Sequence, residues 1–339
     1  MRHGLTKSVA SGQSRVGAKV GELIIDLNLA YASLLWEQNE RKPYELADVR
    51  IPGDMVEFLE GGDASMDAAR QALEFAQERE ADLLAPLGER VFFSESEIEW
   101  LAPVPRPGKI IIVVMNNWEM YPDRSEKPPY FQWALKASNT VIGHMGTIRI
   151  PAIGAHPEIE LGVVIGKWVS RVPREQADSV IAGYTIFNDV SADTAMDHYS
   201  FTTHGVDPET GEEREVTILG SLANSKSRDT FSPMGPWLVT RDEVQDPTNL
   251  KMVSKSNGEV IQEGSTKDLI FGPAEIIAFI SNFLTLEPGD VISTGTVGWT
   301  TAKEDGYGAA QWARRSFKGV LELEIEGLGT LRNAVVGPG

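Results

Sequence analysis

The chain has 339 residues, of which 42% are hydrophobic and 24% charged, as expected of a soluble globular protein with about two domains. Its net charge of −18 argues against nucleic-acid or anionic-membrane partners, which require clustered Lys and Arg. Because the chain contains no cysteine, disulfides, thiolate catalysis and zinc–thiolate sites are excluded. No signal-peptide core or membrane-spanning apolar run is present, so we expect a cytoplasmic protein.

The first hundred residues combine short strands with helical patterns. Residues 15–27 predict a strand, a Gly-Glu turn and a second strand. Residues 27–38 and 65–84 predict helices, the second with Ser65 as a candidate N-cap. The proline-rich stretch that follows is the best candidate domain boundary. The domain prediction is a small N-terminal α/β domain over 1–100, a connector over 101–108 and a larger domain over 109–339.

The larger domain is predicted to consist mainly of short strands, which is typical of an α+β, β-rich fold. Residues 109–114 read as a buried strand, and residues 272–284 as the one clear helix. Residues 203–215 are polar and rich in turn formers, so we predict a surface loop or insertion there.

Two acidic islands about thirty residues apart give the clearest chemical signal. Glu158 and Glu160 alternate with apolar residues, and side chains at i and i+2 share one face of a strand. Two adjacent carboxylates repel, so either one is protonated or both share a cation. Asp189 follows another apolar run and could complete an all-oxygen site for a hard ion such as Mg²⁺. The same spacing also occurs on solvated strand faces, so spacing alone leaves both interpretations open.

Sequence blocks from Leu101 onward resemble, in order, those of the fumarylacetoacetate hydrolase family. The matching blocks are 101–110, 158–167, 183–192, 226–237, 257–262, 286–296 and 326–333. The resemblance implies a mixed β-roll catalytic domain, a homodimer, and Mg²⁺ or Mn²⁺ held by Glu158, Glu160 and Asp189. Family members cleave carbon–carbon bonds, decarboxylate or dehydrate 2-oxo and 1,3-dicarbonyl acids.

The resemblance also suggests roles for residues around the metal. Lys226 matches the family lysine that pairs with a metal-bound carboxylate or with the substrate. Gly295 and Thr296 would hold a substrate carboxylate through backbone N–H groups and a hydroxyl, and Gln262 is a candidate substrate contact. His156 would share a strand face with Glu158 and support the metal shell, although a simple exposed histidine is equally compatible with its position.

Several positions depart from the family pattern. Aligned through Asn116, Met120 stands where a lid histidine activates water together with a glutamate, and Asp123 stands where that glutamate would be. Trp133 is aligned with a family lysine. Asp193 follows Ala192, where an arginine is usual. Trp118, Met120 and Trp133 would therefore make the substrate pocket more apolar and suited to planar groups.

Three functional hypotheses follow from these departures. Another base, namely Asp123, Glu119, His198 or His204, would support hydrolysis of a carbon–carbon bond in a 1,3-dicarbonyl, acylpyruvate-like substrate with an aromatic or apolar part. Chemistry that needs no lid histidine would instead be dehydration, decarboxylation or isomerisation of a 2-oxo acid through a metal enolate. The third hypothesis is a non-catalytic homologue that binds a metal or ligand. Of these, hydrolysis through a metal-stabilised enolate is the leading expectation.

Overall fold

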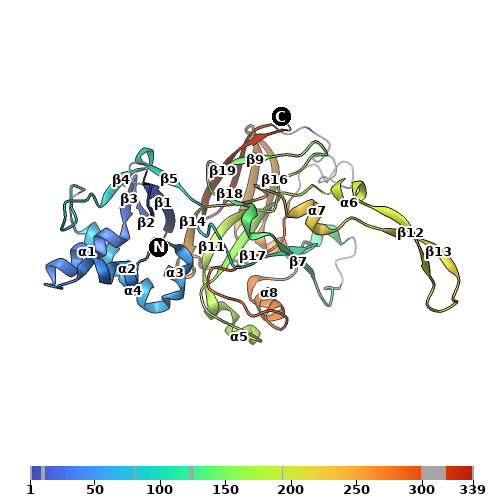
Figure 1. The fold of residues 1–339 in the computed structure, drawn as a ribbon, viewed down its shortest axis with the longest axis horizontal. Coiled ribbons are helices and arrows are strands. Elements are labelled where there is room, and N and C mark those ends of the chain that lie inside the picture. The colour runs from blue at the N-terminus through green and yellow to red at the C-terminus, as the bar shows by residue number, and fades with distance from the viewer. Residues whose placement is uncertain are drawn as a thin grey trace.

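The computed structural model describes residues 2–8, 12–79, 81–121, 126–192, 194–298 and 318–337. The N-terminal part begins with strands, continues with helices and ends with two short strands (Figure 1). In chain order these are β1 (Arg2–Ser8), β2 (Ser14–Val20), β3 (Leu23–Asp26), α1 (Leu27–Glu37), α2 (Pro43–Arg50), α3 (Met55–Glu60), α4 (Gly62–Gln77), β4 (Phe92–Ser94) and β5 (Ile98–Trp100).

The remainder of the chain is rich in strands, as the sequence predicts. Its strands are β6 (Ile110–Val114), β7 (Gln132–Lys136), β8 (Val141–Ile142), β9 (Thr147–Arg149), β10 (Ile159–Ile165), β11 (Ile181–Asn188), β12 (Phe201–Val206), β13 (Glu213–Ile218), β14 (Ser232–Thr240), β15 (Lys251–Ser256), β16 (Glu259–Ser265), β17 (Val291–Ser293), β18 (Gly319–Ile325) and β19 (Gly329–Val336). Its helices are α5 (Arg174–Ala177), α6 (Thr194–His198), α7 (Leu222–Lys226) and α8 (Pro273–Ile280).

One twelve-stranded sheet runs through the described chain in the order β4-β3-β2-β1-β14-β11-β10-β17-β6-β7, with β5 beside β1 and β8 beside β14. The N-terminal strands therefore join the sheet of the larger part, through the antiparallel pairing of β1 with β14. A five-stranded sheet, β16-β15-β18-β19-β9, packs against one face of the large sheet. The division at residues 101–108 stays a prediction.

The two faces of the large sheet belong to two apolar cores because side chains alternate along each strand. On β10, Ile159, Leu161 and Val163 lie in the core shared with the five-stranded sheet. Val164, on the opposite face, lies in a second core with Phe187 and with buried residues of α1, α3 and α4. Every residue of β10 is buried, so a polar side chain at its end is held in a fixed, dry environment.

Two local expectations require correction. The helix predicted over 65–84 is α4, which begins at Gly62 and ends at Gln77, so Ser65 lies inside the helix and is not its N-cap. The loop interpretation of residues 203–215 is also wrong, because most of them belong to the antiparallel hairpin β12–β13, whereas the interpretation as an insertion stays a prediction. Within the described residues, no helix combines the length and the apolar character required to cross a membrane.

Candidate active site

Three carboxylates meet where β10 begins and β11 ends. The register pairs Ile159 with Asn188, and the Asp189 backbone N–H donates to the Glu158 carbonyl at 3.0 Å. Glu160 points to the same face of β10 as Glu158, because the two are two residues apart. One oxygen from each of Glu158, Glu160 and Asp189 lies within 4.8 Å of the others. The structure thus brings together the three acids that the sequence singles out.

Lys226, at the end of α7, bridges two of these acids. Its Nζ donates to Glu158 Oε2 and to Asp189 Oδ2, both at 2.7 Å. The side chain is 9% exposed, so the two ion pairs are shielded from solvent. Burial alone would raise the pKa of Glu158, but the positive charge of Lys226 and the hydrogen bond from His156 outweigh burial and lower it.

A second lysine in the cluster was missed by sequence reasoning. Lys136, with a fully buried side chain, donates to Asp189 Oδ1 at 2.5 Å and to the carbonyl oxygens of Phe231 and Val190 at 2.6 and 3.3 Å. Burial is the main cause that lowers the pKa of Lys136, opposed by the charge of Asp189. Although Trp133 is aligned with a family lysine, the cluster does contain a lysine from this strand, since Lys136, three positions later, reaches Asp189.

His156 and Ser191 hold Glu158 from its other side. The two residues exchange backbone hydrogen bonds at 2.8 and 3.0 Å. His156 Nε2 lies 3.2 Å from Glu158 Oε1, and Ser191 Oγ donates to Glu158 Oε2 at 3.1 Å. Because His156 is only 1% exposed, it is not a simple surface histidine but a support for the first carboxylate.

Glu160 is the acid whose negative charge is least compensated by its neighbours. Its Oε2 accepts from Ser293 Oγ at 2.5 Å and from the Gly295 backbone N–H at 2.7 Å. Its Oε1 accepts no hydrogen bond from the described residues. Burial, and then the charges of Asp189 and Glu158, raise the pKa of Glu160 well above its usual range. An ionised Glu160 therefore requires a nearby cation.

The donor set fits a divalent cation. Three carboxylates and two ammonium groups leave one net negative charge, and Glu160 keeps an oxygen available. All three acids offer oxygen, the ligand type that Mg²⁺ and Mn²⁺ prefer. The residues that would hold such an ion are Glu158, Glu160 and Asp189.

Gln262 and Thr296 form a bracket next to the carboxylates. Gln262 Oε1 accepts from the Ile159 backbone N–H at 3.2 Å and from Ser254 Oγ at 3.1 Å. Its Nε2 donates to Thr296 Oγ1 at 2.8 Å, and Thr296 Oγ1 donates to the Ile159 carbonyl at 2.9 Å. Gln262 is fully buried, so it positions β10 and the loop after β17.

Gly295 occupies a special backbone position in that loop. Its φ of 96° is one that side-chain-bearing residues rarely adopt, and an added Cβ would lie 3.0 Å from the Asn116 Cβ. Asn116 Nδ2 donates to the Thr294 carbonyl at 2.8 Å, and Asn117 Nδ2 to the Thr296 carbonyl at 3.1 Å. The segment after β6 thus fixes the loop that presents the Gly295 N–H to Glu160.

The predicted lid begins immediately after these asparagines. A short 3₁₀ helix, η2 (Trp118–Met120), is capped by Asn117. Trp118 is half-buried against the core, whereas Glu119 is exposed. The side chain of Met120 and all of Asp123 and Asp193 lie outside the described residues.

Trp133 does not share the strand face of Lys136, because the two residues lie three positions apart along β7. Its ring packs on Phe283 with a centroid distance of 5.9 Å. His198 and His204 are both exposed, and His204 lies on the projecting hairpin opposite Glu215. Neither histidine has a contact with the three carboxylates among the described residues.

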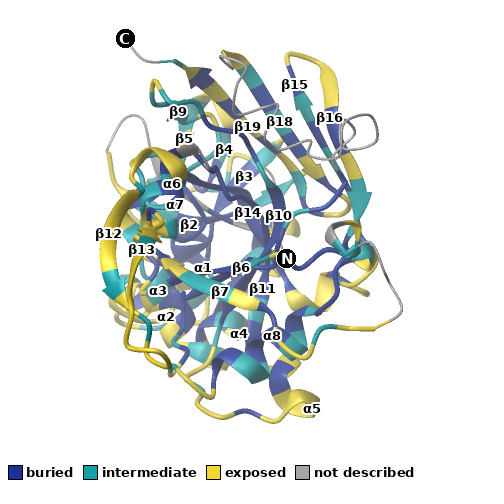
Figure 2. Cartoon of the chain, turned by 90° about the vertical axis from the view of Figure 1, so that its right-hand side faces the viewer, coloured by how far each residue is buried: buried dark blue, intermediate teal, exposed yellow. Residues whose placement is uncertain are grey.

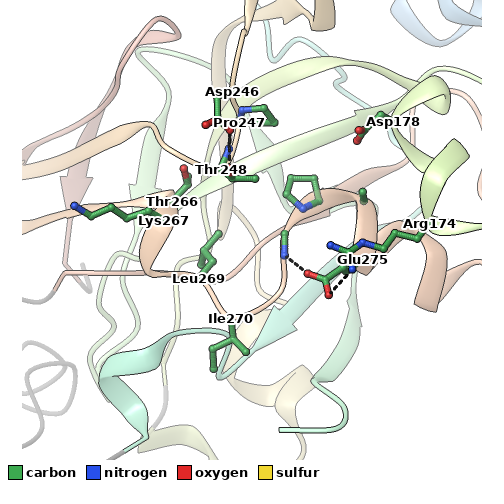
Figure 3. A pocket seen from close by; sticks show the side chains of 13 residues that line it. Arg174, Asp178, Asp246, Pro247, Thr248, Thr266, Lys267, Leu269, Ile270 and Glu275 are labelled. Carbon is green, nitrogen blue, oxygen red and sulfur yellow. Dashed lines mark hydrogen bonds and ion pairs between the residues drawn. The ribbon is translucent and has the colours of Figure 1, made fainter. Parts of the chain in front are cut away.

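A separate pocket of about 520 Å³ lies at the start of α8 (Figure 3). Its lining mixes the cations Arg174 and Lys267 with the acids Asp178, Asp246 and Glu275. Figure 3 shows Glu275 turned toward Arg174, at 3.5 Å, so these charges already compensate one another. No residue of the carboxylate cluster lines this pocket.

Comparisons with known proteins agree with the geometry. Residues 114–336 match the family model described as fumarylacetoacetate (FAA) hydrolase C-terminal. The chain is 34% identical to oxaloacetate tautomerase FAHD2A, mitochondrial, of Bos taurus over 84% of this chain and 81% of the relative. It is 32% identical to oxaloacetate tautomerase YisK of Bacillus subtilis, over 88% of this chain and 91% of the relative.

A solved structure with the same fold covers the whole chain. It is maleylpyruvate hydrolase from Sphingobium sp. SYK-6 in complex with manganese(II) and pyruvate, with a TM-score of 0.67, 24% identity and 100% coverage of both chains. At this identity the likeness establishes the fold alone, and it agrees with the predicted β-rich α+β architecture.

Proposed function

Because the chain belongs to the fumarylacetoacetate hydrolase family, we propose that it is a divalent-metal-dependent tautomerase that interconverts the keto and enol forms of a 2-oxo dicarboxylate such as oxaloacetate. Relatives at 32–34% identity that carry the name oxaloacetate tautomerase support this choice. Mg²⁺ or Mn²⁺ would be held by Glu158, Glu160 and Asp189. When bound, the ion supplies Lewis acidity that favours the enolate form of a 2-oxo acid.

The observation that carries the proposal is the charge balance of the cluster. Three carboxylates and two buried lysines, Lys136 and Lys226, leave a single negative charge. A divalent ion makes this total positive, which suits a small dianion. Lys226 offsets one of the two negative charges that it bridges and presents an ammonium group beside them. Lys136 holds Asp189 from within the fold, so this acid keeps its orientation when a ligand binds.

Tautomerisation also suits the residues around the lid. Hydrolysis needs a base that activates water, and the position of the expected lid histidine is occupied by Met120. Keto–enol interconversion only moves a proton between carbon and oxygen, with no attack by water. Glu119 and Asp123 are the candidate bases for this proton. Gly295 and Thr296 remain candidate contacts for a substrate carboxylate.

The decisive experiment gives the metal-loaded protein oxaloacetate and, separately, acylpyruvates in ¹⁸O-water. We expect faster decay of the enol absorbance of oxaloacetate, abolished by EDTA and by Glu160→Gln, with no label in a new carboxylate. The variants Glu119→Gln and Asp123→Asn test the two candidate bases. The variant that loses the base should slow the decay of the enol absorbance without altering the metal content. Cleavage of an acylpyruvate with incorporation of ¹⁸O, and no effect on enol decay, would instead support the hydrolase hypothesis.

A further inference from the structure

Both ends of the chain segment between Asn117 and Lys127 attach to one short stretch at the start of α8. We call this stretch, residues 269–275, the α8 support. At the first end, the Phe271 backbone N–H donates to Asn116 Oδ1 at 2.8 Å, and Asn116 Nδ2 donates to the Phe271 carbonyl at 2.9 Å. Asn116 is buried, so water does not compete for these two hydrogen bonds. The first end of the segment is therefore fixed to the α8 support.

Lys127 attaches the second end of the segment to the same support. Its Nζ donates to Glu275 Oε1 at 2.7 Å and lies 4.3 Å from the centroid of the Phe271 ring. The face of an aromatic ring attracts a cation, so the carboxylate and the ring both act on one ammonium group. Phe131, four positions further along the chain, packs against the Phe271 ring with a centroid distance of 5.1 Å. Phe271 therefore contacts the chain on both sides of the segment.

The two partners of Lys127 are held in place by other groups. Glu275 Oε2 accepts from the Gly272 backbone N–H at 3.3 Å, which is the reciprocal bond of a capped helix start. Arg174 Nη1 lies 3.5 Å from Glu275 Oε1, and Figure 3 shows the two side chains together at this end of α8. Phe271 is buried. The α8 support thus presents Lys127 with a carboxylate and a ring whose positions are already fixed.

The first end of the segment is also connected to the three carboxylates. Asn117 Nδ2 donates to the Thr296 carbonyl at 3.1 Å, and the Gly295 N–H donates to Glu160 at 2.7 Å. Asn117 Oδ1 accepts from the Glu119 backbone N–H at 2.8 Å. A short series of hydrogen bonds therefore links the backbone of Glu119 to Glu160. The position of Glu119 relative to the carboxylates depends on how the segment is held.

We propose that Lys127 is a positioning residue for the reaction: by binding Phe271 and Glu275, it fixes the second end of the segment and so the position of Glu119. Lys127 acts through the segment, because among the described residues no hydrogen bond or ion pair joins it to the three acids. The proposal rests on the proposed function, in which Glu119 is a candidate base.

An ordinary surface ion pair would have no such role. The Lys127 side chain is 40% exposed, and an exposed ion pair by itself contributes little. Two observations argue for more than a surface pair. The ammonium group lies on a buried aromatic ring as well as on a carboxylate, and both partners belong to the stretch that also binds Asn116. One ion pair thus completes an attachment made at both ends of the segment.

The first test compares the kinetics of enol decay in variants of the metal-loaded protein. Lys127→Met keeps the apolar stem of the side chain and should lower kcat about tenfold, while KM and Mn²⁺ affinity stay within about twofold. Lys127→Arg keeps a cation for the ring and the carboxylate and should restore kcat. Glu275→Gln should lower kcat as well, and the double variant Lys127→Met/Glu275→Gln should be no slower than Lys127→Met alone.

Arg174→Met is the matched control, because Arg174 approaches the same carboxylate but has no hydrogen bond or ion pair with the described residues of the segment. It should leave kcat unchanged. Three results would overturn the proposal: an unchanged kcat in Lys127→Met, an equal loss in the control, or losses from Lys127→Met and Glu275→Gln that multiply in the double variant.

The second test does not use activity. Hydrogen exchange followed by mass spectrometry reports on the N–H groups of Glu119 and Tyr121, which donate to Asn117 Oδ1 and to the Trp118 carbonyl. A peptide that covers these residues should exchange faster in Lys127→Met than in the unmodified protein or in Arg174→Met. Equal exchange in all three would overturn the positioning role. If the unmodified protein does not accelerate enol decay, the proposed function fails, and the exchange rates still decide whether Lys127 holds the segment.

Discussion

Replacing Lys226 by methionine should tighten metal binding while lowering turnover. In the structure, the Lys226 ammonium lies between Glu158 and Asp189, with both N–O distances at 2.7 Å. A metal that takes these oxygens must share or displace those hydrogen bonds. Methionine keeps the length and apolar stem of the side chain and removes only its charge and donors. The lysine and the metal are thus expected to compete for the same two carboxylates.

The magnitude is worked from the loss of one of the two charged hydrogen bonds. A hydrogen bond to a charged group contributes about 1.5–3 kcal/mol, so losing one competitor tightens binding by about 10- to 150-fold. Turnover should fall by about 100-fold, because a positive group aimed at developing negative charge is lost.

Calorimetry of the metal-stripped protein with Mn²⁺ measures the affinity, and the enol-decay assay measures turnover. Lys251→Met is the matched control, since Lys251 is 63% exposed and pairs with Glu263 at 3.1 Å, away from the three acids. It should change neither quantity. Weaker Mn²⁺ binding in the Lys226→Met variant would refute the reasoning, because lysine and metal would then not compete for Glu158 and Asp189.

Three further outcomes are expected. Lys136→Met leaves a buried Asp189 without its inner partner and should lower the free energy of unfolding of the metal-free protein by about 3–5 kcal/mol, measured with urea; a loss below about 1 kcal/mol would contradict this. Gln262→Leu removes the hydrogen bond that the Thr296 hydroxyl accepts and the acceptor of the Ile159 backbone N–H, so turnover should fall while Mn²⁺ affinity stays within about threefold; unchanged turnover would contradict the bracket. Burial raises the pKa of Asp26 to about 6. The folded chain therefore keeps a proton there that the unfolded chain releases, so the free energy of unfolding should fall by up to about 3 kcal/mol between about pH 4 and 6. Asp26→Asn, which can still accept from the Leu29 N–H, should lose this slope, and an unchanged slope would assign it to other groups.

The sequence predicts that the three carboxylates lie together, because their proximity depends on the period of two along a strand. Alternation along β10 puts Glu158 and Glu160 on one face, and the antiparallel register brings Asp189 beside them. The order of the family blocks supplied Lys226, which no spacing rule connects to residues 37 positions earlier. Long-range pairing of this kind is visible only once the strands are placed.

The errors have physical causes as well. Lys136 was overlooked because the alignment placed the lysine position at Trp133, and a shift of three residues on a strand exchanges one face for the other. Residues 203–215 predict a surface loop or insertion because Asp207 to Glu212 is polar, although apolar residues flank this stretch on both strands of the hairpin, at Phe201 and Ile218. The alternation of apolar residues along exposed strands does not by itself indicate, from the sequence of one chain, which face is buried.

A backbone hydrogen bond joins the two ends of the segment that carries the hairpin β12–β13. The Ala192 backbone N–H donates to the Ser225 carbonyl at 3.2 Å, so the chain closes on itself just outside the Asp189–Lys226 ion pair. The hairpin residues from Phe201 to Ile218 can change in length or composition without moving either member of the pair, because loop closure costs little more for a longer loop. The hairpin is therefore a natural position for insertion: a short turn, a longer hairpin or a foreign domain could be grafted there while the three carboxylates stay in place.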